Sequence, residues 1–151
     1  MAWVGAACGS IRDLVTRPGA SPDPDAAQRA AIRLAPHPDS VAVARRFVFD
    51  EVASWGFEPP GDVSLLTSET VSNAVLHAQT EAVVVRAERL GGRVRVEVED
   101  DDPTSPEVRS PELGAVGGFG LFLVTSLAHL WGVDDIGDDG KVVWFEVTLT
   151  D

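Results

Sequence analysis

The sequence predicts an α+β domain: a two-layer sandwich in which helices cover one face of a mixed, mostly antiparallel sheet. Apolar residues recur at helical spacing over residues 41–55 and again over about 62–78, so two helices follow each other directly. Two runs rich in valine, 82–87 and 93–98, are joined through a pair of glycines and form a predicted hairpin. The absence of alternating strands and helices argues against a Rossmann-type parallel sheet.

Composition narrows the classes of protein and partner. At 151 residues the chain fits one domain with its own core, and its net charge of −12 argues against nucleic acid or an anionic membrane as a direct partner. Cys8 is the only cysteine, which excludes an intrachain disulfide and a thiolate metal cluster. No apolar run is long enough for a signal peptide or a bilayer span, so we expect a cytoplasmic protein.

The N-terminal part of the chain differs in composition from the rest. Gly, Ala, Pro and Asp dominate residues 1–30, which predicts a flexible arm preceding a domain over residues 31–151. Residues 31–34 fit a short edge strand, and Asp39 or Ser40 fits the N-cap of the first helix.

Beyond the hairpin the composition changes again. Residues 103–117 are rich in Pro, Ser and Gly, and loops of this length in compact domains are usually functional or disordered. A largely apolar helix is expected over 121–130. A strand is expected to start at 131–133, and the last strand is expected over 142–149.

The helix over about 62–78 carries an unusual polar stripe. Glu69, Asn73 and His77 follow at i, i+4 and i+8 and therefore stack along one side. Solvent-facing stripes normally have charged neighbours, whereas this one is bordered by leucines (Leu65, Leu66 and Leu76). The pattern favours a mostly buried helix whose three polar groups face a cleft. The alternative is an ordinary amphipathic helix whose polar face meets water.

Three later features have chemical interpretations as well as simple structural ones. Asp100 ends a strand, segment 118–121 opens a helix with Gly-x-Gly, and segment 140–144 opens the last strand. Taken singly, they fit a solvated acidic turn, local flexibility before a helix and ordinary hairpin chemistry.

In this order and spacing the features resemble the GHKL superfamily of ATP-binding domains, which have the Bergerat, or histidine-kinase-like ATPase, fold. The resemblance covers roughly residues 31–149 and is closest to the compact bacterial anti-sigma-factor serine/threonine kinases. The segments that resemble the family's N box, first ATP box, second ATP box and closing segments are 68–78, 96–100, 118–124, 127–133 and 140–144.

The resemblance implies ATP and Mg²⁺ as cofactors. Asn73 would be the Mg²⁺ ligand. This hard ion takes oxygen ligands, so the Asn73 carboxamide oxygen and the ATP phosphate oxygens would bind it together. Glu69, one turn earlier, would be the catalytic base that activates the attacking hydroxyl. His77 is counted with the ATP-binding residues, a structural hydrogen bond near the cleft being the alternative.

The same resemblance indicates which residues would contact the adenine ring and the phosphates of ATP. Asp100 would accept a hydrogen bond from the adenine amino group, which favours ATP over GTP. Gly118, Gly120 and Leu121 would bring backbone amides to the phosphates at a helix N-terminus. Residues 103–117 would form a lid over the nucleotide.

Two positions depart from the family pattern. Asp102 stands where the superfamily often has glycine, and Val142 stands where a threonine often supports the adenine contact. Valine has no hydrogen-bonding group with which to provide that support.

The function that the resemblance implies is an ATP-binding regulator of the anti-sigma-factor type. It would sequester a sigma factor and phosphorylate a serine or threonine of an anti-sigma-factor antagonist. The alternative is a binding module that senses ATP or sequesters a partner without phosphorylating it; a homodimer is left open. A sensor histidine kinase fits less well, because no upstream helical pair carries a phosphoacceptor histidine.

Overall fold

The computed structural model describes residues 28–77, 79–102, 126–136 and 140–150. Nearly all of the expected arm (1–30) and the whole expected lid (103–117) lie outside the described residues.

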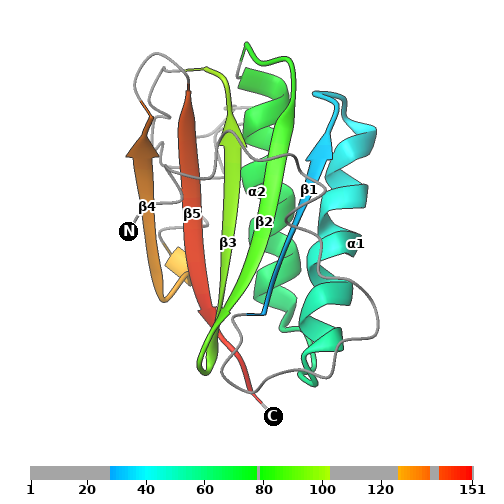
Figure 1. The fold of residues 1–151 in the computed structure, drawn as a ribbon, viewed down its shortest axis with the longest axis vertical. Helices are drawn as coiled ribbons and strands as arrows, with labels where there is room; N and C mark the ends of the chain where they lie inside the picture. The colour runs from blue at the N-terminus through cyan, green and yellow to red at the C-terminus, as the bar shows by residue number, and fades with distance from the viewer. Residues whose placement is uncertain (1–27, 78, 103–125, 137–139, 151) are drawn as a thin grey trace, which may run out of the picture.

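The described strands form one antiparallel sheet in the order β1-β2-β3-β5-β4 (Figure 1). Every pairing among them is antiparallel, and the tight hairpin predicted around two glycines joins β2 to β3. The strands are β1 (Arg29–Leu34), β2 (Val83–Leu90), β3 (Arg93–Asp100), β4 (Leu130–Asp135) and β5 (Lys141–Thr148). The predicted α+β fold class is confirmed, and all the strands foreseen in the described residues are present.

Two helices cover one face of this sheet, as Figure 1 shows. Helix α1 (Asp39–Ser54) contacts β1 and β2, and helix α2 (Gly61–His77) contacts β2, β3 and β5. The two helices also pack against each other. Asp39 and Ser40 lie inside α1 instead of capping it: Pro38 is at the N-cap with no side-chain cap bond, and the Ser40 hydroxyl donates to the Ala35 carbonyl at 2.7 Å.

The core lies between the helices and the sheet. Alternate strand residues meet one face of each helix, and the side chains that are essentially fully buried include Val48, Leu66, Val85, Val96 and Phe145. Burying side chains of this size stabilises the fold by about 1.5–3 kcal/mol each. This core therefore fixes α2 against the centre of the sheet.

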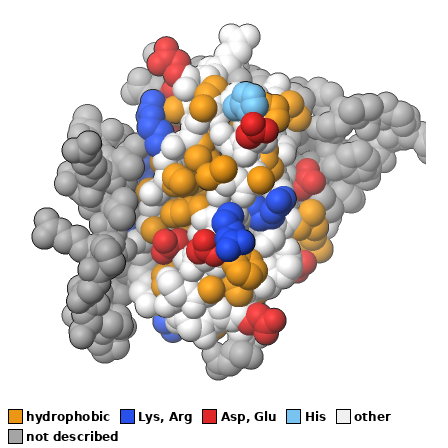
Figure 2. Space-filling model, turned by 90° about the vertical axis from the view of Figure 1, so that its right-hand side faces the viewer, with side chains coloured by type: hydrophobic (Ala, Val, Ile, Leu, Met, Phe, Trp, Pro, Cys, Tyr) orange, Lys and Arg blue, Asp and Glu red, His pale blue; other side chains and the backbone are white. Residues whose placement is uncertain are grey.

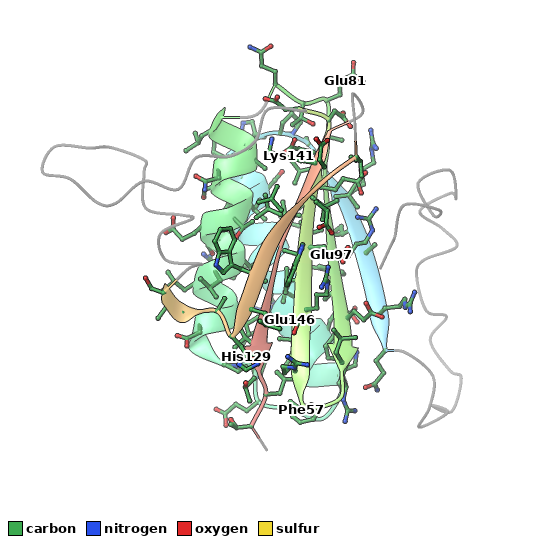
Figure 3. The ribbon with its side chains drawn as sticks, turned by 90° about the vertical axis from the view of Figure 1, so that its left-hand side faces the viewer. Phe57, Glu81, Glu97, His129, Lys141 and Glu146 are labelled. Atoms are coloured by element: carbon green, nitrogen blue, oxygen red, sulfur yellow. The ribbon has the colours of Figure 1, made fainter. Side chains whose placement is uncertain are left out.

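The opposite face of the sheet carries many charged side chains. Successive residues of a strand point to opposite faces, and those that point away from the helices include most of the charged ones. Arg95 donates to Glu97 at 2.9 Å and to Glu146 at 3.5 Å, and Figure 3 labels the two glutamates along the sheet. Trp144 lies on this charged face, whereas Trp131 packs against the core.

The predicted helix over 121–130 extends too far. Within its described part, residues 126 and 127 are helical, but Leu130 already begins β4 opposite Glu146. The His129 amide donates to the Glu146 carbonyl at 2.8 Å, so sheet pairing has taken over before the apolar run ends. Hydrophobic character alone does not separate a buried helix from a strand.

Candidate functional site

Four chain segments meet at one end of the sheet: the end of α2, the start of β2, the end of β3 and the start of β5. In the strand register Asp100 lies opposite Val83 on one side and Lys141 on the other. Figure 3 shows Lys141 and Glu81 at this end of the molecule, beyond Glu97 along the sheet. The topology thus brings the polar helix and the strand-end aspartate to the same region.

Hydrogen bonds join the segment after α2 to the turn after β3. The Gln79 amide donates to Asp102 Oδ2 at 2.9 Å, and the Asp101 amide donates to Thr80 Oγ1 at 2.9 Å. The Glu81 amide lies 3.4 Å from Asp101 Oδ2 and completes the set. The end of α2 is therefore tied to the end of β3, two residues beyond Asp100.

Asp100 is almost fully buried, at 2% exposure. Its Oδ1 accepts from Lys141 Nζ at 3.0 Å and from the Asp102 amide at 2.9 Å. Burial raises the pKa of Asp100 above its ordinary value of 3.8, and the hydrogen bond from Lys141 opposes this rise. Among the described residues no donor is bonded to Oδ2.

Glycine at position 140 allows this close approach of the strands. Its φ is +127°, and a Cβ there would collide with the Asp100 carbonyl oxygen. Any side chain would therefore push β5 away from β3 at the point where Lys141 reaches Asp100.

The two departures from the family pattern have structural explanations. Asp102 uses its carboxylate to hold the Gln79 amide, so the acidic side chain has a role that glycine cannot fill. Val142 pairs with Glu99, and its side chain lies on the sheet face opposite to Asp100. Val142 therefore does not lie beside Asp100 in the sheet. The strand register gives that position to Lys141.

Lys141 is the residue that sequence reasoning missed. It is the only lysine in the chain, and it directly follows a turn glycine at the start of a strand. A single lysine at a core-facing position of a strand indicates a buried ion pair, because lysine is almost never fully buried unless it is paired.

The polar stripe on α2 is only partly enclosed. Glu69 and Asn73 are half-buried, one turn apart. Their leucine neighbours differ from the expectation: Leu66 belongs to the core, while Leu65 and Leu76 are 40% and 64% exposed. Positions on a helix advance by about 100° each, so Leu65 and Leu76 fall on nearly the same exposed side, whereas Leu66 points about 100° away from Leu65 into the core.

Other predicted site residues lie outside what the structure describes. His77 is the last residue of α2, and its side chain is among the parts not described. Gly118, Gly120 and Leu121 also lie outside the described residues.

The residues that are described fit a nucleotide. Asp100 offers a buried acceptor, and Asn73 offers a carboxamide oxygen on the helix that ends beside it. Within the described ranges no three His, Cys, Asp or Glu side chains gather as a metal site. A bound Mg²⁺ would supply charge neutralisation of phosphates and would take Asn73 together with phosphate oxygens as ligands.

Comparison with protein families decides the assignment. The family model described as "Histidine kinase-like ATPase domain" matches residues 24–147. The chain belongs to the histidine kinase-like ATPase domain family. This membership confirms the GHKL resemblance and implies ATP as the ligand of the histidine kinase-like ATPase domain. None of the helices in the described parts of the chain is long and apolar enough to cross a bilayer.

Two solved structures are similar to this histidine kinase-like ATPase domain. The RsbU and RsbW domains of Rv1364c from Mycobacterium tuberculosis match with a TM-score of 0.57 and 22% identity, over 80% of this chain and 32% of that chain. The histidine kinase domain of the blue-light activated histidine kinase from Erythrobacter litoralis EL346 matches with a TM-score of 0.44 and 32% identity, over 59% of this chain and 44% of that chain. The first likeness shows a shared fold with a protein that is much longer than the part matched. No curated protein matches this chain.

Proposed function

We propose that this domain is an ATP-binding regulatory kinase of the anti-sigma-factor type. It sequesters a sigma factor, and it phosphorylates a serine or threonine of an antagonist protein to release that factor. Family membership and the fold shared with a chain that contains an RsbW domain support the proposal. The order of the sequence boxes supports the same class.

The observation that carries the proposal is the attachment of α2 to the end of β3. The Gln79–Asp102 and Asp101–Thr80 hydrogen bonds hold the helix that bears Glu69 and Asn73 beside the strand that bears Asp100. This arrangement supports the proposed roles of Asp100 as the adenine contact and Asn73 as the metal ligand, since a site for Mg-ATP requires both at one end of the sheet.

Glu69 supplies the catalytic step in this proposal. It lies one turn before Asn73 on α2 and is half-buried, so it remains within reach of a hydroxyl that approaches from solvent. It accepts the proton of the antagonist's hydroxyl as that oxygen bonds to the terminal phosphorus of ATP and the bond from that phosphorus to the leaving ADP oxygen breaks. Asn73 would hold the metal ion that neutralises the phosphates.

A second surface supports the binding of a protein partner. Arg45 and Arg46 line a hollow of about 380 Å³ with Phe49 on the outer side of α1 and α2. Phe49 is 42% exposed. Figure 2 shows basic and hydrophobic side chains next to each other on this face of the molecule. Arg46 is paired with Asp50 on this surface, so the exposed ring of Phe49 beside Arg45 chiefly favours a partner with its own apolar residues.

The decisive experiment compares phosphate transfer with nucleotide binding. A pull-down from the native host, with and without Mg-ATP, identifies the partners, and radiolabelled ATP then tests transfer to the captured antagonist. Glu69→Gln should keep ATP affinity within a few-fold and lose transfer by about 10²-fold or more, because Gln cannot accept a proton at neutral pH.

Glu58→Gln is the matched control, since Glu58 is exposed and lies in the link between the two helices. It should change neither quantity. If the wild type binds ATP and captures a sigma factor but labels no antagonist, the alternative of a non-catalytic, partner-sequestering module replaces the kinase.

A further inference from the structure

Lys141 is a buried cation that none of the predicted roles uses. It is the chain's only lysine and is 7% exposed. Because Lys141 and Asp100 are directly paired in neighbouring antiparallel strands, their side chains share the sheet face that α2 covers. The lysine therefore belongs to the same end of the sheet as the candidate adenine contact.

The hydrogen bonds of this pair leave one donor and one acceptor unused. Lys141 Nζ donates to Asp100 Oδ1 at 3.0 Å and to the Asp102 carbonyl at 3.0 Å, and an ammonium group has three donors. Among the described residues, nothing accepts the third N–H of Lys141 and nothing donates to Asp100 Oδ2. The ion pair thus presents a donor beside an acceptor.

This arrangement matches the edge of an adenine ring. Adenine offers an amino group that donates and, next to it, the ring nitrogen N1 that accepts. We propose that Lys141 is a second base-reading residue, which donates a hydrogen bond to adenine N1 while Asp100 accepts from the amino group. The inference rests on the proposed ATP site and adds to it a specificity-determining side chain.

The ion pair also explains how a buried lysine is maintained at this position. A buried charge is costly unless it is paired and hydrogen-bonded, and Lys141 has both a carboxylate and a carbonyl as partners. A purely structural ion pair would affect folding stability but would not respond to a change at one atom of the base. The test is therefore built on that atom.

Calorimetry on the full chain with Mg-ATP and with the Mg²⁺ complex of 1-deaza-ATP provides the test. The analogue keeps the amino group and replaces N1 by C–H. Wild-type protein should bind it about tenfold more weakly than ATP, because a buried donor is left unpaired. This comparison needs no variant, so a folding defect cannot obscure it.

Lys141→Met should bind ATP more weakly and should bind the two nucleotides with equal affinity. Arg93→Met is the matched control for the loss of one positive charge, since Arg93 begins β3 at the far end from Asp100 and pairs with Glu146. It should keep the wild-type ratio between ATP and the analogue.

The outcomes separate this inference from the proposed function. Equal wild-type affinity for ATP and 1-deaza-ATP overturns the role of Lys141 and leaves ATP binding intact. Tighter ATP binding by Lys141→Met also overturns it, because the lysine would then occupy the place of the base. Failure of the wild type to bind any ATP rejects the proposed function itself.

Discussion

The Arg95 guanidinium lies over the Trp144 ring, with its carbon 3.9 Å from the ring centroid. The contact lies on the charged face of the sheet, away from both helices. A cation placed over a tryptophan face stabilises a fold by about 0.5–2 kcal/mol, depending on how far it is desolvated. The ring also borders Gly132 of the neighbouring strand β4, where an added Cβ would lie 2.6 Å from Trp144 Cζ2.

Gly132→Ala should therefore destabilise the domain. The Trp144 ring must shift to admit the methyl group and loses its position under Arg95, which should lower the free energy of unfolding by about 1–3 kcal/mol. Urea unfolding measures the change. Gly92→Ala is the control, because nothing lies within 4 Å of a Cβ there, and a similar loss in both variants would contradict the explanation.

Stability should also depend on the charge of Glu97, which is 2% exposed. Burial raises the pKa of Glu97 above 4.5, and its hydrogen bond with Arg95 opposes the rise only in part. A raised carboxyl pKa means that folding favours the protonated form. The contribution of Glu97 to the free energy of unfolding should therefore be greatest below pH 4.5 and fall as the pH rises through the folded-state pKa.

Glu97→Gln should remove this dependence and raise stability at pH 7, with the difference from wild type closing below pH 4.5. Arg95 keeps Glu146 and Trp144 as neighbours in the variant. Urea unfolding at several pH values is the measurement, with the exposed Glu58→Gln as control. A less stable variant at pH 7 would mean that the ion pair outweighs the cost of burying the charge.

The metal assignment depends on Asn73. Asn73→Ala should abolish Mg-dependent ATP binding and leave the fold intact, because the side chain is half-buried and outside the core. Calorimetry with Mg-ATP, repeated with the metal chelated, measures the effect. Ser72→Ala, at the neighbouring half-buried position of α2, should bind normally. Undiminished affinity in Asn73→Ala would remove Asn73 from the site.

Base selection depends on Asp100. The wild type should prefer ATP to GTP, and Asp100→Asn should lose most of that preference, since one buried contact of this kind supplies about 1–3 kcal/mol. Competition between the two nucleotides for each protein is the measurement. Equal affinity of the wild type for ATP and GTP would show that Asp100 does not read the base.

The sequence was sufficient for the architecture, but it did not define the strand pairing. Periodicity predicted both helices and the β2–β3 hairpin, because one period dominates each of those segments. Periodicity did not predict where the helix ends before Leu130, because one apolar run continues from a helix into strand β4. It also could not tell that Lys141, and not Val142, lies opposite Asp100. A register shift of one residue exchanges the two faces of a strand, and only the pairing settles it.

The hydrogen bonds between α2 and β3 have a dynamic consequence. The amides of Gln79, Asp101 and Asp102 lie beyond α2 and β3, yet each donates to a side-chain oxygen. The Gln79 and Asp101 bonds join the segment after α2 to the turn after β3, so one local opening there frees both amides together, whereas the Asp102 bond to Asp100 lies within the turn. The deuterium uptake of Gln79 and Asp101 should follow a common rate that is faster than that of the core strands. These amides would then act as reporters of how often the end of β3 separates from α2.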